Sequence, residues 1–207
     1  MTFDFSEFKN KKIIVTGSST GIGFETGVEF LNLGANVIFH GNQSINDLEA
    51  RIKTKSQSQN FKLFKSDFTD LSQVDNFMND AINYLDGLDI LVNNAGTMVG
   101  RYQLDSISEK DFLKIFDLNA KSAYFATKSA CTIFKKQNYG NIINVSTISA
   151  RTGGSAGSSV YAASKAFVSA ITRSLVSELS PYNIRINAIS PGTCLLYTSP
   201  SPRDSVV

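Results

Sequence analysis

A strand, a glycine-rich loop and a helix follow one another near the N-terminus, and this succession limits the possible folds most. Residues 12–16 form a β-branched apolar run, which is typical of a buried strand. The loop that follows consists of Gly17, Ser18, Ser19, Thr20, Gly21, Ile22 and Gly23. Because a helical pattern begins at Ile22, the loop would offer free backbone N–H groups and a positive helix end to a pyrophosphate. An ordinary strand-to-helix turn with chance glycines is the alternative, and the flanking strand and helix favour the cofactor loop.

Further apolar runs alternate with helical patterns along the rest of the chain. The expected strands are residues 12–16, 36–40, 61–65, 88–92, 141–145 and 185–189. Such alternation is typical of the α/β class and predicts a Rossmann-type, doubly wound and mostly parallel sheet. Ligands of such a sheet bind at the carboxyl ends of the strands. Since no internal repeat or linker divides the chain, we expect one domain over residues 1–193.

Composition excludes several classes of protein. Of the 207 residues, 42% are hydrophobic and 18% charged, which is enough to bury a core and argues against disorder. The net charge of +2 is too small to indicate a nucleic acid or an acidic membrane as partner. No run of about 18 apolar residues is present, and two cysteines form no disulfide framework. We therefore expect a cytoplasmic protein, and a single histidine makes a metal site improbable.

The end of the second expected strand bears on the choice of nucleotide. A carboxylate there would bind the 2′-OH of NAD(H) and repel the 2′-phosphate of NADP(H). This chain has His40, Gly41 and Asn42 instead, so we expect NADP(H) to be favoured over NAD(H), although no arginine follows to hold the phosphate. His40 is either a contact of the 2′-phosphate or simply a polar residue at a strand end.

Polar and small residues follow the third and fourth expected strands. Asp67 could accept a hydrogen bond from the adenine amino group, or it could cap the next helix or turn. Asn94, Ala95 and Gly96 follow the fourth strand, where small residues let the backbone approach a ligand and amides can join neighbouring strands.

The second half of the chain carries the candidate acid–base residues. Tyr161 and Lys165 are four residues apart at the start of a helical pattern, so they share a helix face, and the ammonium is expected to lower the pKa of the phenol. Ser146 and Thr147 end the fifth strand. Asn119 lies inside a helical stretch over 108–137, where asparagine is unfavourable unless it bonds something. The apolar residues of that stretch cover more than one face, which predicts contact with a neighbouring subunit.

Together these motifs resemble the short-chain dehydrogenase/reductase family, in the group of 3-oxoacyl-acyl-carrier-protein reductases and of sugar or steroid dehydrogenases. The resemblance covers residues 9–193. Its motifs are residues 16–23 for the cofactor loop, 93–96 for the sheet-stabilising turn, Asn119 for the helix asparagine, Tyr161 and Lys165 for the catalytic pair, and Pro191 and Gly192 for the turn beside the nicotinamide.

The resemblance implies hydride transfer between the nicotinamide and a small-molecule carbonyl or secondary alcohol. Tyr161 would be the general acid/base, Lys165 would lower its pKa and bind the nicotinamide ribose, and Asn119 would hold a water of the proton relay. The family's usual serine at the end of the fifth strand corresponds to Thr147, and we expect this hydroxyl to polarise the substrate, with Ser146 as second choice. A catalytically impaired dinucleotide-binding or regulatory protein is the alternative function, and the presence of Tyr161, Lys165 and Asn119 argues against it.

The last residues depart from the family. Residues 194–204 resemble the in-frame translation of a sequencing-library adapter, so we expect residues 194–207 to be a non-native tail. The family's seventh strand would then be missing. We expect the full-length parent to be an active homodimer or homotetramer, and this shorter chain to be poorly soluble or inactive.

Overall fold

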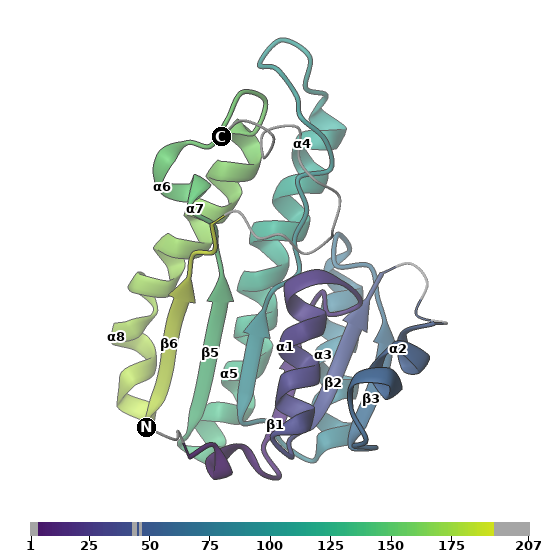
Figure 1. Ribbon diagram of the computed structural model, residues 1–207. Coiled ribbons are helices and arrows are strands. Elements are labelled where there is room, and N and C mark those ends of the chain that lie inside the picture. Colours follow the sequence, from purple (N-terminus) through teal and green to yellow (C-terminus); the bar gives the residue numbers. More distant parts are fainter. Residues whose placement is uncertain (1–3, 43–44, 46, 193–207) are drawn as a thin grey trace.

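Six parallel strands form one sheet in this computed structural model, which describes residues 4–42, 45 and 47–192. The strands are β1 (Lys12–Val15), β2 (Asn36–Gly41), β3 (Phe61–Lys65), β4 (Ile90–Asn93), β5 (Gly140–Val145) and β6 (Ile184–Ile189). Their spatial order is β3-β2-β1-β4-β5-β6, and every neighbouring pair is parallel (Figure 1). The predicted Rossmann-type fold is therefore confirmed, with the strand order reversing between β1 and β4.

Helices cover both faces of this sheet (Figure 1). They are α1 (Gly21–Asn32), α2 (Leu48–Lys55), α3 (Leu71–Leu85), α4 (Glu109–Phe116), α5 (Ser122–Gln137), α6 (Ser149–Thr152), α7 (Ser159–Ser174) and α8 (Val176–Leu179), with short 3₁₀ turns at Ser6–Phe8 and Ser180–Tyr182. Successive strand residues face opposite layers. Ile14 packs in the core beneath α3 and α5, whereas Ile13 and Val15 pack beneath α1 and α2.

The helical stretch expected over 108–137 is divided in the structure. After α4, residues Asp117–Lys121 form a π-helical turn (η2), and α5 begins at Ser122. The turn contains Asn119, whose side chain forms hydrogen bonds with the backbone of Thr97. The regular α-helix is interrupted at this point. π-helical turns of this kind occur frequently at functional sites, and an apolar periodicity does not reveal them. Ser108 is the N-cap of α4, because its Oγ accepts a hydrogen bond from Asp111 N at 3.1 Å.

The C-terminal elements differ from the expectation in a second way. The helical pattern expected to start at Tyr161 begins two residues earlier as α7 and is interrupted at Leu175 before α8. Within the described residues β6 pairs with β5 alone. The segment 194–207, expected to be non-native, lies outside the described residues, and the boundary at 193 stays a prediction.

A glycine sets how closely α1 approaches β2. A methyl group at Gly27 would overlap the ring of Phe39, which is completely buried. We predict that Gly27→Ala lowers the free energy of unfolding by about 1–3 kcal/mol, because the core has no room for the added methyl. Phe39→Leu should remove much of that clash, so the double variant should lose less than the sum of the single losses. Urea unfolding of the four proteins measures this coupling, and strictly additive losses would contradict the packing.

Candidate active site

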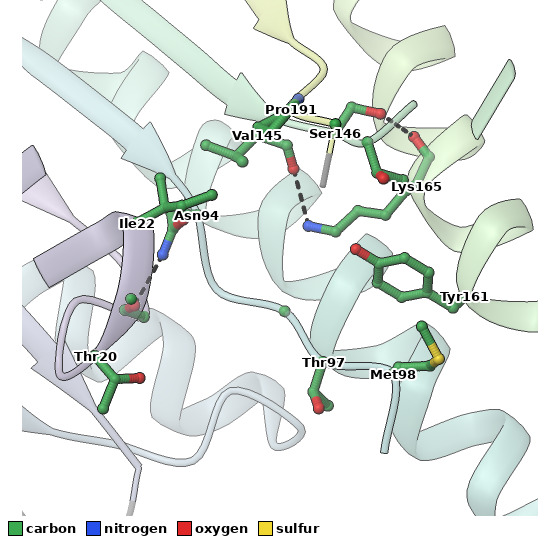
Figure 2. A pocket seen from close by; sticks show the side chains of 15 residues that line it. Thr20, Ile22, Asn94, Thr97, Met98, Val145, Ser146, Tyr161, Lys165 and Pro191 are labelled. Atoms are coloured by element: carbon green, nitrogen blue, oxygen red, sulfur yellow. Dashed lines mark hydrogen bonds between the residues drawn. The ribbon is translucent and has the colours of Figure 1, made fainter. Parts of the chain in front are cut away.

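An open cleft of about 420 Å³ lies at the carboxyl ends of β1, β4 and β5, where the strand order reverses. Many of the residues singled out in the sequence line it (Figure 2). These are Gly17, Thr20, Gly21, Ile22, Asn94, Gly96, Ser146, Thr147, Tyr161, Lys165, Pro191 and Gly192. Thr97, Met98 and Val145, which no sequence motif indicated, complete the lining. Residues from five separate segments of the chain therefore meet in one hollow.

The glycine loop provides one wall of the cleft with no side chain to fill it. Gly17 and Gly21 have φ angles of 60° and 61°, which favour glycine. A methyl at Gly17 would lie 2.6 Å from Ala95 Cα, so only glycine permits this approach of the two loops. Thr20 occupies the N-cap position of α1 without a side-chain cap bond, which leaves first-turn N–H groups for an anion. This wall fits a dinucleotide pyrophosphate.

Thr16 and Asn94 join the glycine loop to the loop that follows β4. The Thr16 hydroxyl accepts hydrogen bonds from the backbone N–H groups of Asn94 and Ala95, both at 3.0 Å. The side-chain amide of Asn94 also donates, to the carbonyl oxygens of Thr16 at 3.0 Å and Gly17 at 2.8 Å. Asn94 thus joins the ends of neighbouring strands, as its amide led us to expect, and its partner Thr16 is the first residue of the cofactor-loop motif.

His40 supports the glycine loop from inside the protein. Its ring is 2% exposed and stacks on Phe68 with a centroid distance of 3.9 Å. Nδ1 accepts a hydrogen bond from Gly17 N at 2.9 Å, so Nε2 carries the proton and donates to Ser66 O at 3.0 Å. With both nitrogens engaged, the expectation of a direct 2′-phosphate contact is wrong for this conformation, because apolar burial places the ring out of reach.

Asp67 and Asn42 lie together beyond the ends of β3 and β2. The Asp67 carboxylate accepts hydrogen bonds from the Thr69 N–H at 2.9 Å and the Thr69 hydroxyl at 2.8 Å. Burial acts to raise the pKa of Asp67, but the bonds from Thr69 and from the Asn42 side chain outweigh it and hold the pKa below 3.8. Asp67 therefore acts as a turn-forming residue here, one of its two expected roles, and neither it nor Asn42 lines the cleft.

Lys165 extends from α7 into the floor of the cleft. The residue is 4% exposed, and its Nζ donates to the backbone carbonyl of Val145 at 2.9 Å (Figure 2). A methyl at Gly96 would lie 2.8 Å from this Nζ, so the absence of a side chain at Gly96 makes room for the amine. Burial lowers the pKa of Lys165 to about 8. The amine thus still carries its charge for the most part at neutral pH.

Tyr161 points its hydroxyl into the same part of the cleft (Figure 2). Burial raises the pKa of Tyr161, and a hydrogen bond with the Thr147 side chain acts in the opposite direction. The sequence predicted a pKa lowered by Lys165; this is wrong for the structure, where burial outweighs the other effects.

Ser146 was the second choice for the hydroxyl that polarises the substrate. Its Oγ donates to the Lys165 carbonyl at 3.0 Å and contacts Ser169, so it faces α7.

Asn119 connects the loop after β4 to the catalytic helix. Its Oδ1 accepts a hydrogen bond from Thr97 N at 2.7 Å, while its Nδ2 donates to Thr97 O at 2.9 Å and Ser164 Oγ at 3.0 Å. The side chain is completely buried and does not line the cleft. Asn119 therefore fixes the distance between Thr97 and α7, which also carries Lys165. Neither Thr97 nor Ser164 was recognised from the sequence.

Comparison with known proteins decides the family. Residues 11–200 match the family described as short chain dehydrogenase. The chain belongs to this family. The match covers the glycine loop, the strand ends and the Tyr161 helix, and it confirms the resemblance drawn from the motifs.

Named relatives of this short-chain dehydrogenase are matched over about three quarters of their own length. It is 35% identical to the 3alpha-hydroxysteroid dehydrogenase of Mediterraneibacter gnavus, over 91% of this chain and 75% of that protein. It is 32% identical to the 2-dehydro-3-deoxy-D-gluconate 5-dehydrogenase of Dickeya dadantii, over 93% and 75%. A solved structure, the NADH-dependent reductase A1-R' complexed with NAD, superposes with a TM-score of 0.85 at 32% identity, over 92% of this chain and 81% of that one. These relatives support an oxidoreductase, and the acyl-carrier-protein reductase subgroup stays a prediction.

The buried state of His40 predicts a pH effect on the stability of this short-chain dehydrogenase. Burial lowers the pKa of His40 from 6.5 to about 4. The unfolded chain therefore binds a proton near pH 6.5 while the folded chain does not, and stability should fall between pH 6.5 and 4 by up to about 3 kcal/mol. Urea unfolding at several pH values measures the fall, which His40→Phe should abolish. Since the chain has one histidine, its imidazole NMR signals are unambiguous, and titration near pH 6.5 would contradict the burial.

Proposed function

We propose that the site in this chain is that of an enzyme that transfers a hydride between a nicotinamide dinucleotide and a small-molecule carbonyl or secondary alcohol. One observation carries the proposal. Tyr161, Thr147 and the buried Lys165 line the same cleft as the uncapped glycine loop. A general acid/base thus lies beside a cradle for a pyrophosphate, which is the combination that such a reaction needs.

The walls of the cleft have the features that a dinucleotide requires. The glycine loop, including Ser19, Thr20 and Gly21, would hold the pyrophosphate and the adenosine end, and Asn94, Gly96, Pro191 and Gly192 would line the nicotinamide end. When bound, the nicotinamide ring supplies or accepts the hydride at its C4 atom. Lys165 would bind the adjoining ribose, because its Nζ is available at the cleft surface beside Gly96.

The residues of the chain move the proton that accompanies the hydride. In reduction, the carbonyl carbon of the substrate takes the hydride and its oxygen takes the Tyr161 proton; oxidation of the alcohol reverses both transfers. Thr147 lines the cleft with Tyr161 and can donate a hydrogen bond to the same substrate oxygen. The Lys165 charge stabilises the phenolate that forms when Tyr161 gives up its proton. Asn119 keeps α7 and the β4 loop in place, and a water bound beside it would complete the relay.

The nucleotide is proposed to be NADP(H) in preference to NAD(H). His40, Gly41 and Asn42 end β2 and follow it without a carboxylate to repel a 2′-phosphate. The related reductase A1-R' is described as NADH-dependent, so the preference varies among similar chains or is absent here. The dehydrogenases named above act on a hydroxysteroid and a sugar acid, which supports an alcohol or carbonyl without selecting one.

A homodimer or homotetramer is the proposed assembly. Phe112, on α4, and Tyr124, on α5, are 42% and 39% exposed, and both belong to the helical stretch whose apolar residues cover more than one face. Exposed aromatic side chains of this kind are enriched at interfaces between proteins.

No helix in the described part of the chain is long and apolar enough to cross a membrane.

Replacing Tyr161 tests the proposed chemistry. We predict that Tyr161→Phe lowers kcat for carbonyl reduction by about 10²- to 10⁴-fold, since the general acid is lost. Nucleotide binding should stay within about twofold, because the phenol ring and its packing remain. Stopped-flow absorbance at the nicotinamide band measures the rate, and fluorescence titration measures the binding. Tyr182→Phe, a similar change at an exposed tyrosine, is the control, and a Tyr161→Phe variant as active as this control would contradict the proposal.

A further inference from the structure

An arginine reaches the glycine loop from a helix that the sequence motifs do not include. Arg51 lies on α2, and its Nη1 donates a hydrogen bond to the Ser19 carbonyl at 2.9 Å. The guanidinium carbon lies 4.6 Å from the centroid of the Phe24 ring. The ring and the carbonyl hold the guanidinium beside the loop, although the side chain is still 39% exposed. The cation is thus both oriented and accessible.

The position of Arg51 corresponds to one part of the proposed nucleotide site. A methyl at Gly41 would lie 2.9 Å from Ser19 Cβ and 3.2 Å from Ser19 Oγ, so Ser19 faces the end of β2. In a Rossmann fold the adenosine ribose is contacted at that strand end. Because Arg51 donates a hydrogen bond to the Ser19 carbonyl, its charge lies beside the residue that faces the end of β2, where a 2′-phosphate would be held.

The other cations of α2 are already paired with carboxylates. Lys53 Nζ donates to Glu49 at 2.5 Å, and Lys55 Nζ donates to Glu25 at 2.7 and 2.8 Å. Arg51 differs from both lysines. It forms a long ion pair with Asp47, whose carboxylate lies 3.9 Å from Nη1, beyond hydrogen-bonding distance.

The guanidinium has donors left for a ligand. Among the described residues, its only hydrogen bond is the one from Nη1 to Ser19, and guanidinium carries five N–H donors. Phosphate is the group that such a fork binds in bidentate geometry. Asp67, the carboxylate beyond the next strand, is engaged by Thr69 and Asn42, so it competes little for Arg51.

We propose that Arg51 binds the 2′-phosphate of NADP(H) and thereby gives this chain its preference for NADP(H) over NAD(H). This inference rests on the proposed function and supplies the arginine that the residues directly after β2 lack. Arg51 is a specificity-determining residue, and it is remote from the proton transfer at Tyr161.

Nucleotide titrations of the full chain test this inference. Arg51→Gln should weaken NADPH binding roughly tenfold or more, the loss of a charge-assisted bond, while NADH binding stays within about twofold. Arg51→Lys keeps the charge without the fork, so it should fall between the wild type and Arg51→Gln. The fragments 2′,5′-ADP and 5′-AMP should show the same contrast, because they differ in the 2′-phosphate. Lys53→Gln is the matched control, since it removes one positive charge from the same helix.

The outcomes separate the two proposals. Equal weakening of NADPH and NADH by Arg51→Gln, or no weakening of either, would overturn the role of Arg51. If Lys53→Gln lost as much NADPH affinity as Arg51→Gln, the role of Arg51 would also be overturned. The positive charge of the helix, and not the contact made by Arg51, would then determine NADPH affinity. A wild-type chain that binds NADH but not NADPH overturns the inference and leaves the proposed function, whereas one that binds neither overturns both. Urea midpoints of the variants, expected to match the wild type, show that binding is compared between folded proteins.

Discussion

The hydrogen bonds that Asn94 donates, from its backbone and from its side chain, to Thr16 are the contact on which the site depends. They join the loops that follow β1 and β4, the two strands between which the strand order reverses. Parallel pairing of Val15 with Val92 brings the two strand ends to the same level, and the side chains of Thr16 and Asn94 then fasten the loops. One loop carries the glycine cradle, and the other carries Gly96 beside Lys165. A sheet without this contact would have both loops but no common cleft.

Burial is the second constraint, and it acts on the two basic side chains in different ways. Lys165 extends past Gly96 to the Val145 carbonyl, so its charge lies at the base of the cleft beside Tyr161. His40 lies in the apolar layer beneath the glycine loop and is neutral there, so its Nδ1 can accept the Gly17 N–H. One buried base thus keeps a proton for the chemistry, while the other shapes the loop.

The sequence predicted the sheet, the glycine loop and the residues lining the cleft, because these follow from local patterns and from the order of strands. It did not predict the π-helical turn at Asn119. Such a turn inserts one residue into a helix, and the apolar residues before and after it keep the same helical period. The two possibilities for His40 were separable only by packing against Phe68, which lies 28 positions further along the chain. Arg51 was missed because its partners, Ser19 and Phe24, lie on other elements and no motif links them.

The central claim is that the cleft between the β1 and β4 loops holds a nicotinamide dinucleotide, and amide NMR tests it most directly. We would record ¹H–¹⁵N spectra of the chain during titration with NADPH and with NADH. We predict that the largest shifts fall on Gly17, Gly21, Asn94 and Gly96, and that they saturate together. Unchanged spectra at millimolar nucleotide, or shifts confined to the outer groove between α5 and α8, would contradict it.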